Sequence, residues 1–337
     1  MQKSTQTSVT TGEAWSVTHL LTPADGDYVA AMRVMLEPWK GMFRGTAARA
    51  VFDEMFNRVP PPSHVTYDAD TVAGVPGWWC RPTGANSEQA VLYLHGGAYV
   101  MGSAKAFRHF VGHVAARAKA LAYIPDYRLG PEHPFPAAVE DAQAVYRGLV
   151  ARGVRRIAIA GDSAGGGLGL VLLSAATTEA DRTGSNRPVG MAAFSPWTDL
   201  VPTDRGWDER AAADPIFVRD QLDDFARLYL GGHASSDPSA SPLYGNMEGL
   251  PPIRVHVGED EALLHDSCRY VAKAVAAGVD ARLDVWQGML HVFPANVGRL
   301  AAAEAALDAS GLFLAERLRV REVHGNSAYS TRGMDVS

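Results

Sequence analysis

From Gln89 onward the sequence alternates short apolar runs with helical stretches, and this alternation limits the possible folds more than any other feature. The apolar runs are AVLYLHGG, LAYIPDYR, RIAIAGDS, GMAAFSPW, IRVHVGED and ARLDVWQG, and an Ala-rich helix is predicted from about Ala295 to Arg319. Strands that are apolar throughout, with helices between them, are typical of a parallel sheet covered on both faces. We therefore predict an α/β fold, with ligand chemistry at the carboxyl ends of the strands.

A helical segment and two further strands are predicted before this region. Between Asp27 and about Arg58, apolar residues recur at spacings of three and four, as they do in amphipathic helices. HVTYDAD and PGWWCRP then alternate as strands do, which brings the predicted sheet to eight strands. The first ~20 residues and the last ~15 have the polar composition of frayed ends.

Composition and charge exclude several classes of function. The 337 residues carry a formal net charge of -6 and no basic stripe, which argues against a nucleic-acid partner. No apolar run reaches the ~20 residues of a membrane span, and the polar amino terminus lacks the apolar core of a secretory signal. The two cysteines, Cys80 and Cys268, do not make a disulfide framework and suit a reduced compartment. We predict a soluble cytoplasmic protein.

The stretch GDSAG lies between the strand RIAIA and the helix GGGLGLVLLSAA, and it contains the strongest candidate for a nucleophile. It fits the G-x-S-x-G elbow, a sharp strand-to-helix turn that exposes the serine and that needs small neighbours. Glycine weakens strands and helices by roughly 0.5–1 kcal/mol each, so this glycine cluster indicates a backbone that bends sharply. Ser163 is therefore predicted to be the nucleophile, and a structural glycine-rich turn is the alternative.

A serine hydroxyl needs a base to accept its proton, and His291 is the candidate by position. It follows the last predicted strand, in DVWQGMLHVF. His109 and His113 lie one helical turn apart in FRHFVGH, like a pair of metal ligands, but they lack a third ligand nearby, and no metal is predicted. His95 lies in a glycine-rich loop, where we expect it to hold the loop by hydrogen bonds or to contact the substrate.

The imidazole in turn needs a carboxylate that fixes its tautomer and stabilises its charged form. The stretch VHVGEDEALLHDS, after the strand Ile253 to Val257, offers Glu259, Asp260, Glu261 and Asp266. We favour Glu261. Asp260 is second, because a shift of one residue in the turn exchanges the two, and Asp199 in SPWTDL is third. With Glu261 the chain order is nucleophile, acid and base, which is the order this kind of fold uses.

The stretch LHGGAYVMGS follows an early strand and is the predicted oxyanion-binding loop. Its glycines let backbone N–H groups point at the negative charge that develops on the substrate. Gly96, Gly97 and Ala98 are the candidate donors in the loop, together with the N–H of Ala164 beside the nucleophile. The alternative is an ordinary glycine turn.

Taken together, these blocks resemble the bacterial hormone-sensitive lipase family of α/β-hydrolase esterases. The resemblance covers HGGAYVMGS, DYRLGPEHPFPAAVED, GDSAGGGL, SPWTDL, LPPIRVHVGEDEALLHDS and GMLHVF, in the family's order, from Val91 to about Ala295. It implies the nucleophile Ser163, the base His291, the acid Glu261 and the oxyanion donors named above. Two positions depart from the commoner pattern: Ala98 stands where a third glycine is more usual, and Gly130 stands where LAPE is commoner. At Glu261 many members have Asp followed by Pro, and a subgroup with Glu resembles this sequence.

The same resemblance implies an α/β-hydrolase fold with a mostly parallel eight-stranded sheet, helices on both faces and a helical cap. Residues 1–60 are then a helical cap segment, residues 61–320 the catalytic domain with a cap insertion at about 201–232, and residues 321–337 a tail. The aromatic candidates for the pocket lining are Trp39, Phe43, Trp207, Phe217 and Phe225, although such residues at helical spacing more often belong to the core. A homodimer is a further expectation.

The implied function is that of a serine carboxylesterase, which hydrolyses short-chain or small-molecule esters through an acyl-enzyme on Ser163 without a metal or another cofactor. A lactonase or an amidase on the same three residues is a variant of this function. A dehydratase and a non-catalytic small-molecule receptor are the competing classes. A receptor is expected to have lost the base, which this chain retains.

Overall fold

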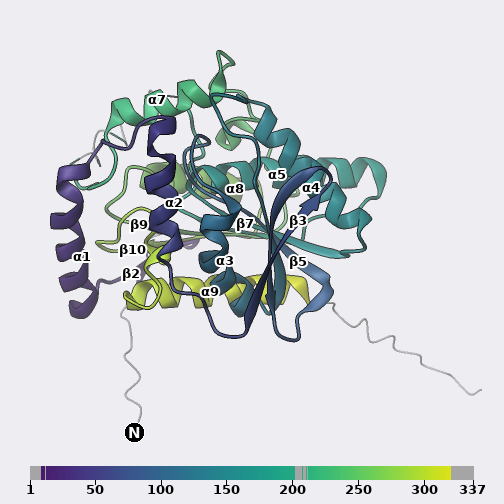
Figure 1. Cartoon of the computed structure of the whole chain (residues 1–337), viewed down its shortest axis with the longest axis horizontal. Coiled ribbons are helices and arrows are strands. Elements are labelled where there is room, and N and C mark those ends of the chain that lie inside the picture. Colours follow the sequence, from purple (N-terminus) through teal and green to yellow (C-terminus); the bar gives the residue numbers. More distant parts are fainter. Residues whose placement is uncertain (1–8, 12, 202–206, 208–209, 211, 320–337) are drawn as a thin grey trace, which may run out of the picture.

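The structure is a computed structural model that describes residues 9–11, 13–201, 207, 210 and 212–319 (Figure 1). The strands of this part of the chain are β1 (Val9–Thr11), β2 (Ser16–His19), β3 (Val65–Val72), β4 (Val75–Pro82), β5 (Asn86–Leu94), β6 (Ala120–Pro125), β7 (Arg156–Asp162), β8 (Met191–Phe194), β9 (Ile253–Gly258) and β10 (Ala281–Trp286). The α-helices are α1 (Pro23–Leu36), α2 (Arg49–Asn57), α3 (Ala104–Ala118), α4 (Ala137–Ala151), α5 (Ser163–Thr183), α7 (Arg219–Leu230), α8 (Leu264–Ala276) and α9 (Ala301–Leu318). Short 3-10 helices are η1 (Glu37–Trp39), η2 (Thr46–Ala48), η3 (Pro242–Tyr244) and η4 (Phe293–Asn296).

The ten strands of the described residues form one sheet in the order β1-β2-β10-β9-β8-β7-β5-β6-β4-β3. Neighbouring strands pair in parallel along the part of this order that runs β2-β10-β9-β8-β7-β5-β6. The hairpin of β3 and β4 adds to β6 in the antiparallel direction, and β1 adds to β2 in the same way. The predicted α/β fold with a mostly parallel sheet is confirmed.

The sheet has two more strands than the eight predicted, and both lie in the amino-terminal segment expected to be frayed. β2 pairs in parallel with β10 from Ser16 to His19. The imidazole of His19 stacks on Trp286 with ring centroids 3.9 Å apart, and its Nε2 lies 2.7 Å from Oδ1 of Asp284. The polar composition concealed this strand because the residues that order it lie at the other end of the chain. The expectation of frayed ends is therefore corrected for residues 16–19.

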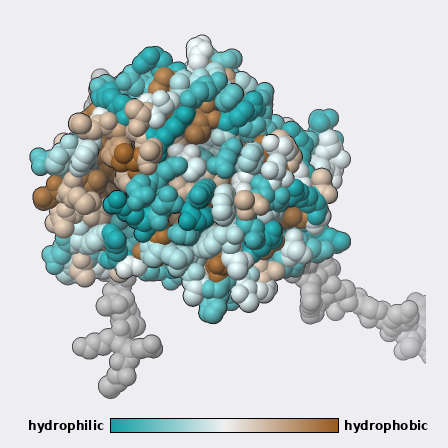
Figure 2. All heavy atoms as spheres, viewed as in Figure 1, coloured by the Kyte–Doolittle hydropathy of each residue, from teal (hydrophilic) through white to brown (hydrophobic). Residues whose placement is uncertain are grey.

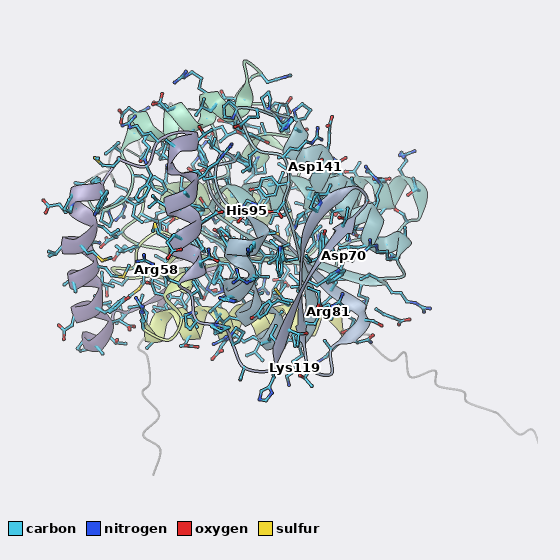
Figure 3. The ribbon with its side chains drawn as sticks, in the orientation of Figure 1. Arg58, Asp70, Arg81, His95, Lys119 and Asp141 are labelled. Atoms are coloured by element: carbon cyan, nitrogen blue, oxygen red, sulfur yellow. The ribbon has the colours of Figure 1, made fainter. Side chains whose placement is uncertain are left out.

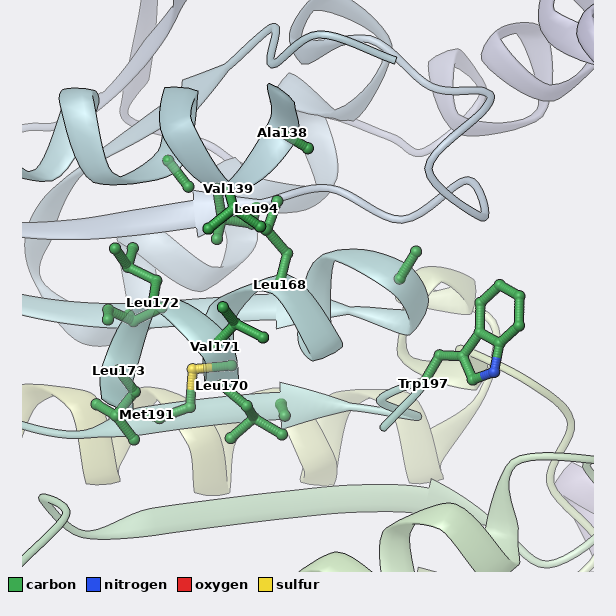
Figure 4. Close-up of a cluster of buried hydrophobic side chains, with 14 of the residues drawn as sticks. Leu94, Ala138, Val139, Leu168, Leu170, Val171, Leu172, Leu173, Met191 and Trp197 are labelled. Atoms are coloured by element: carbon green, nitrogen blue, oxygen red, sulfur yellow. The ribbon is translucent and has the colours of Figure 1, made fainter. Parts of the chain in front are cut away.

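Two hydrophobic cores lie on opposite faces of the sheet. Along β7, Ile157 and Ile159 belong to one core, and the alternate residues Ala158 and Ala160 belong to the other. Helices α4, α5 and α8 cover the first face, and α3 and α9 pack side by side on the second. Figure 4 shows the first core, with Leu168 of α5 among its members. None of the helices in the described part of the chain combines the length and apolar character that crossing a bilayer requires.

The segment between α1 and α2 is joined to the segment that leads into α7. The N–H of Gly41 donates to the carbonyl oxygen of Ile216 at 2.9 Å, and the amide of Gln221 donates to that of Phe43 at 2.6 Å. Figure 1 shows α1, α2 and α7 together at one corner of the molecule. These helices belong to the two segments predicted to form a cap. Residues 202–206, 208–209 and 211 of the predicted insertion, and the predicted tail 321–337, lie outside the described residues.

Candidate active site

Ser163 is the first residue of α5 and directly follows β7. Its φ of 52° lies in the left-handed region, as a sharp strand-to-helix turn requires. A Cβ at Gly161 would lie 2.5 Å from the carbonyl oxygen of Gly165, and a Cβ at Gly165 would lie 2.1 Å from that of Leu94. Strand, turn and helix therefore approach so closely here that these two positions need glycine.

The side chains of Ser163, His291 and Glu261 form one hydrogen-bonded chain. Nε2 of His291 lies 3.0 Å from Oγ of Ser163, and Nδ1 lies 3.1 Å from Oε1 of Glu261. A carboxylate only accepts hydrogen bonds, so Nδ1 carries the proton and Nε2 accepts the serine hydroxyl. The three residues follow β7, β10 and β9, and the carboxyl ends of these parallel strands lie at the same edge of the sheet. Glu261 is completely buried, whereas Ser163 keeps 8% of its surface exposed.

Among the carboxylates considered for the acid, Glu261 is the one that contacts the imidazole. Asp260 instead forms an ion pair with Arg33 of α1. Asp199 lies 2.8 Å from a guanidinium nitrogen of Arg269 and does not reach the imidazole. The adjacent side chains of Asp260 and Glu261 thus point in different directions in the turn after β9. The sequence alone did not show which of the two faces the imidazole.

The second carboxylate oxygen of Glu261 is held by two donors that sequence reasoning missed. The hydroxyl of Ser195 donates to Oε2 at 2.7 Å, and the N–H of Gly258 donates to the same oxygen at 2.9 Å. The Ser195 hydroxyl also accepts the N–H of Val292, the residue after His291, at 3.1 Å. It therefore connects the acid to the backbone beside the imidazole. The position of this buried serine directly after β8 was the only signal that could have pointed to it.

His291 is buried among carboxylates. Burial by itself lowers the pKa of an imidazole, but the charge and hydrogen bond of Glu261, with the charges of Asp214 and Asp162, outweigh it and raise the pKa of His291 above 6.5. Asp214 is fully buried, and its Oδ2 accepts the N–H of Ala262 at 2.7 Å. This environment stabilises an imidazolium, which is what a base needs when it accepts a proton during a reaction.

Residues 96–98 are the predicted oxyanion loop, and the structure corrects the prediction for Gly96. The N–H of Gly96 donates to Oδ1 of Asp162 at 3.0 Å, and a carboxylate is a strong acceptor. This N–H is therefore not a free donor for an oxyanion in the cavity. Within the described residues the N–H groups of Gly97 and Ala98 have no acceptor. The N–H of Ala164 lies in the first turn of α5, where a helix provides no internal partner. Gly97, Ala98 and Ala164 remain the candidate donors.

Asp162, directly before the nucleophile, is a buried carboxyl that the sequence reasoning passed over. Its Oδ1 accepts the hydroxyl of Tyr93 at 2.8 Å in addition to the N–H of Gly96. Burial raises the pKa of Asp162 to about 7, although both hydrogen bonds lower it. A Cβ at Gly96 would lie 2.2 Å from Oδ2, so the loop approaches this carboxyl only through a glycine. Asp162 therefore anchors the glycine loop beside the nucleophile.

His95 and Arg49 hold the same loop from two other directions. Nδ1 of His95 lies 2.7 Å from the carbonyl oxygen of Gly96, and the ring stacks on Tyr127 in the interior of the molecule (Figure 3). Burial lowers the pKa of His95 to about 4. Arg49 of α2 donates to the carbonyl oxygen of Val100 at 2.7 Å, and it also contacts the Gly130 carbonyl and both carboxylate oxygens of Glu132. The loop is thus tied to the amino-terminal segment.

The histidine pair considered as metal ligands binds the backbone instead. Nδ1 of His109 lies 3.1 Å from the carbonyl oxygen of Val59, and Nε2 of His113 lies 2.8 Å from that of Pro60. No group of three or more His, Cys, Asp or Glu side chains in the described part of the chain is arranged to hold a metal ion. Both imidazoles connect α3 to the segment that follows α2.

A cavity of about 380 Å³ opens beside Ser163 and His291, which both line it together with Gly97, Ala98 and Asp162. Its walls come from α1, α2, α7 and the loops next to them. Of the aromatic candidates from the sequence, Phe43, Phe217 and Phe225 line the cavity. Trp39 is 55% exposed and is not part of the lining, and Trp207 is buried, with its indole N–H bonded to Asp266 at 3.0 Å.

A parallel sheet that brings a serine elbow, an imidazole and a carboxylate together at its carboxyl edge defines an α/β hydrolase. Comparisons with known proteins agree, since a model of the α/β hydrolase fold family matches residues 91–295. The chain is 36% identical to an acetyl-hydrolase of Streptomyces hygroscopicus over 73% of this chain and 82% of that protein. It is 32% identical to an esterase of Acinetobacter venetianus over 73% of this chain and 81% of that one.

Solved structures narrow the class further. An esterase from the bacterial hormone-sensitive lipase family superposes with a TM-score of 0.81 and 37% identity, over 89% of this chain and 100% of that one. The chain belongs to the bacterial hormone-sensitive lipase family of α/β-hydrolase esterases.

Proposed function

We propose that this carboxylic ester hydrolase cleaves its substrate through a covalent acyl-enzyme on Ser163. The observation that carries the proposal is the hydrogen-bonded chain from Oγ of Ser163 through His291 to Glu261, at 3.0 Å and 3.1 Å, at the edge of an open cavity. A serine attacks a carbonyl only when a base accepts its proton, and a base does this best when a carboxylate fixes its tautomer. Both conditions are met here, since the base contacts the serine on one side and the carboxylate on the other.

In the first half of the reaction, Oγ of Ser163 attacks the ester carbonyl carbon while Nε2 of His291 accepts the hydroxyl proton. The carbonyl oxygen becomes an oxyanion, which the N–H groups of Gly97, Ala98 and Ala164 stabilise. The imidazolium then donates its proton to the leaving alcohol, the C–O bond of the ester breaks, and the acyl group stays on Ser163.

In the second half, water takes the place of the alcohol. His291 accepts a proton from this water while the water oxygen attacks the acyl carbon. The bond between the acyl carbon and Oγ then breaks, the imidazolium returns its proton to Oγ of Ser163, and the carboxylic acid leaves. Glu261 accepts the hydrogen bond from Nδ1 of His291 and stabilises the imidazolium in both halves. Loss of one oxyanion donor in such sites costs about 100- to 1,000-fold in kcat, so these N–H groups belong to the catalytic machinery.

The substrates we propose are carboxylic esters of small molecules, short acyl chains included. The relatives named acetyl-hydrolase and esterase support this range. Lactones and amides are attacked by the same chemistry, and their hydrolysis is an outcome of the same assay. A non-catalytic receptor is not favoured, because base, acid and nucleophile are all present and in contact.

The test is the release of p-nitrophenol from the acetate and butyrate esters, together with a phosphonate reagent that labels an activated serine. We expect Ser163→Ala to lower kcat at least about 10,000-fold without a change in the thermal unfolding curve. Ser174→Ala, on the same helix and away from the cavity lining, is the matched control and keeps wild-type turnover. A phosphonate adduct on a residue other than Ser163, or turnover near wild type in Ser163→Ala, would reject the mechanism.

The cytoplasmic location and the homodimer stay predictions. Both cysteines carry free thiols in the structure, which supports a reducing compartment. Light scattering at several protein concentrations measures the mass of the assembly and decides whether the protein is a homodimer.

A further inference from the structure

Asp214 is a fully buried carboxylate in the predicted cap insertion, and none of the reaction steps uses it. Its Oδ1 accepts the N–H groups of Ile216 at 2.7 Å and Phe217 at 3.0 Å. Its Oδ2 accepts the N–H of Ala262, in the turn after β9, at 2.7 Å. One carboxylate therefore joins two segments that lie 48 residues apart in the sequence.

The surroundings of Asp214 fit its ionised form. An ionised carboxylate only accepts hydrogen bonds, and both of its oxygens face backbone N–H groups, which only donate. Burial raises the pKa of Asp214 above 3.8, and the three hydrogen bonds oppose this rise. Hydrogen bonds to a charged acceptor are stronger than those between neutral groups, so these contacts hold the two segments firmly together.

The bond to Ala262 fixes the peptide group that follows Glu261. The carbonyl of Glu261 and the N–H of Ala262 belong to one planar unit, so an acceptor that holds the N–H also sets the backbone of Glu261. The carbonyl oxygen of this unit accepts the N–H of Leu264, the first residue of α8, at 3.3 Å. Two donors hold the side chain of Glu261, whereas Asp214 holds its main chain.

The bonds to Ile216 and Phe217 fix a part of the insertion that contacts the base. An aspartate that accepts N–H groups two and three residues further along the chain forms a compact turn. The ring of Phe217 in this turn lies against His291, with ring centroids 5.0 Å apart and 74° between the ring planes. Asp214 therefore holds backbone on two sides of the imidazole.

The amino-terminal segment is bonded to the same turn. Arg33 of α1 donates to the carbonyl oxygen of Ala213 at 2.7 Å, and the N–H of Gly41 donates to that of Ile216 at 2.9 Å. Figure 2 shows apolar residues gathered on the side of the molecule where Figure 1 places α1. Apolar packing is non-directional, so the orientation of α1 relative to this turn depends on hydrogen bonds. Residues 213–217 therefore connect both predicted cap segments to the turn after β9.

We propose that Asp214 is a positioning residue, which holds the main chain of Glu261 so that the carboxylate of Glu261 faces Nδ1 of His291. This inference rests on the proposed function, in which Glu261 stabilises the imidazolium. Asp214 does not line the cavity beside Ser163, so it acts on the reaction through the acid and the base and not through the substrate. Its loss should therefore lower kcat and leave KM unchanged.

Asp214→Asn tests the bond to Ala262 separately from the turn in the insertion. The amide oxygen of asparagine still accepts the N–H groups of Ile216 and Phe217, whereas its NH2 group cannot accept the N–H of Ala262. We expect kcat on p-nitrophenyl butyrate to fall about 10- to 100-fold, with KM within about twofold, because a hydrogen bond to a charged acceptor is lost. Rates are measured at a pH above the acid limb, where a change in the pKa of His291 does not contribute. A role confined to the insertion predicts a wild-type kcat, and this result would overturn the proposal.

A second variant removes the donor and leaves Asp214 intact. Lactic acid incorporated in place of Ala262 puts an ester oxygen where the N–H was, so the charge of Asp214 and its bonds to the insertion remain. We expect the same fall in kcat, with the acid limb of the pH profile in its wild-type position. This variant decides the question even when Asp214→Asn does not fold, and a wild-type kcat here argues against any role of the Ala262 bond.

The Nδ1–H proton of His291 provides a measurement that needs no turnover. A proton that an imidazole donates to a carboxylate resonates far downfield in the one-dimensional proton NMR spectrum, and His291→Ala identifies the signal by its loss. Spectra are recorded at the pH of the kinetic measurements, where the imidazole is neutral. We expect Asp214→Asn to move this signal upfield or to broaden it beyond detection, because the carboxylate of Glu261 no longer faces Nδ1. An unchanged signal contradicts the proposal, whatever happens to kcat.

Asp25→Asn is the matched control. Asp25 is 3% exposed, and its two oxygens accept the N–H groups of Ala301 at 2.8 Å and Ala302 at 3.0 Å, so it joins α1 to α9 by the same kind of bond. We expect this variant to lose thermal stability but to keep the wild-type kcat and the wild-type His291 signal. Equal losses of kcat in Asp25→Asn and Asp214→Asn would assign both carboxylates to the stability of the fold alone.

The NMR measurement also separates failure of this inference from failure of the proposed function. If the wild type hydrolyses no ester, the proposed function fails. The signal of His291 in Asp214→Asn still decides whether Asp214 positions Glu261 against the imidazole.

Discussion

The hydroxyl of Ser195 lies 2.7 Å from Oε2 of Glu261 and donates a hydrogen bond to it, from a residue that is completely buried. Glutamate has one more rotatable bond than aspartate, so its carboxylate needs more restraint to face an imidazole in one orientation. Ser195 and the N–H of Gly258 supply this restraint at the oxygen that does not contact His291.

We therefore expect Ser195→Ala to lower kcat at least about tenfold on p-nitrophenyl butyrate with little change in KM, because a hydrogen bond to a charged carboxylate contributes about 1.5–3 kcal/mol. Steady-state kinetics measure kcat and KM separately and so test this expectation. Ser310→Ala is the matched control, since Ser310 is equally buried but its hydroxyl has no partner in the described structure. A loss of thermal stability that accompanies an unchanged kcat would assign Ser195 to the fold alone.

The contacts of Glu261 and Asp260 predict very different effects for two adjacent substitutions. Glu261→Gln keeps the shape but removes the charge that stabilises the imidazolium, and we expect kcat to fall about 1,000- to 10,000-fold. Asp260→Asn breaks only an ion pair with Arg33 that is partly exposed, and we expect kcat to fall less than about threefold. Both are measured on p-nitrophenyl butyrate. A larger loss from Asp260→Asn would contradict the assignment of the acid.

The raised pKa of His291 predicts an acid limb in the pH profile of kcat/KM. The base works only when the imidazole is neutral, so activity is lost as the pH falls through the pKa of His291, which lies above 6.5. Asp214→Asn removes a negative charge that raises this pKa, and we expect the acid limb to move to lower pH. The profile is measured on enzyme whose circular dichroism is unchanged.

A surface variant of the same type controls for the general change in charge. Asp181→Asn removes an exposed carboxylate that pairs with Arg187 on the surface, and it should leave the acid limb in place. If the limb in Asp214→Asn stays fixed or moves to higher pH, then Asp214 does not act on the imidazole through its charge.

Arg49 connects α2 to the oxyanion loop and predicts that the amino-terminal segment affects the chemistry. Arg49→Ala removes the bond to the carbonyl of Val100, two residues after Ala98 in the same loop, and we expect kcat to fall about tenfold, because bonds from charged donors contribute about 1.5–3 kcal/mol. Arg44→Ala is the control. Its ion pairs with Asp220 and Asp224 are exposed and screened by solvent, so we expect kcat to stay at the wild-type value. Equal kcat values in the two variants would argue against this role for α2.

The sequence predicted the parts of the molecule whose signals are local. The glycines around Ser163 mark a turn because the close approach of backbone atoms is a property of neighbouring residues. His291 was found from its place after a strand, and the alternation of strands and helices predicted the parallel sheet. Each of these inferences needed no knowledge of which residues meet across the fold.

The parts that could not be predicted depend on contacts between distant segments. β2 has a polar sequence and becomes a strand only because β10 lies beside it. Gly96 was grouped with the oxyanion donors because it lies in the same glycine-rich stretch, but a carboxylate 66 residues away accepts a hydrogen bond from its N–H. Ser195 acts on Glu261 across the same distance, and nothing in FSPW distinguishes that serine from any other.

Several non-glycine residues at the carboxyl edge of the sheet hold left-handed backbone angles, among them Ser163, Ser195 and Val292. The φ values are 52° at Ser163, 51° at Ser195 and 50° at Val292. Such residues cost about 1–3 kcal/mol each and persist only where the surrounding structure forces them. Once the neighbouring packing loosens, a return of these backbone angles to the ordinary regions therefore lowers the free energy. On warming we expect this edge to change shape first, so that catalysis stops at a temperature where the rest of the sheet is still folded.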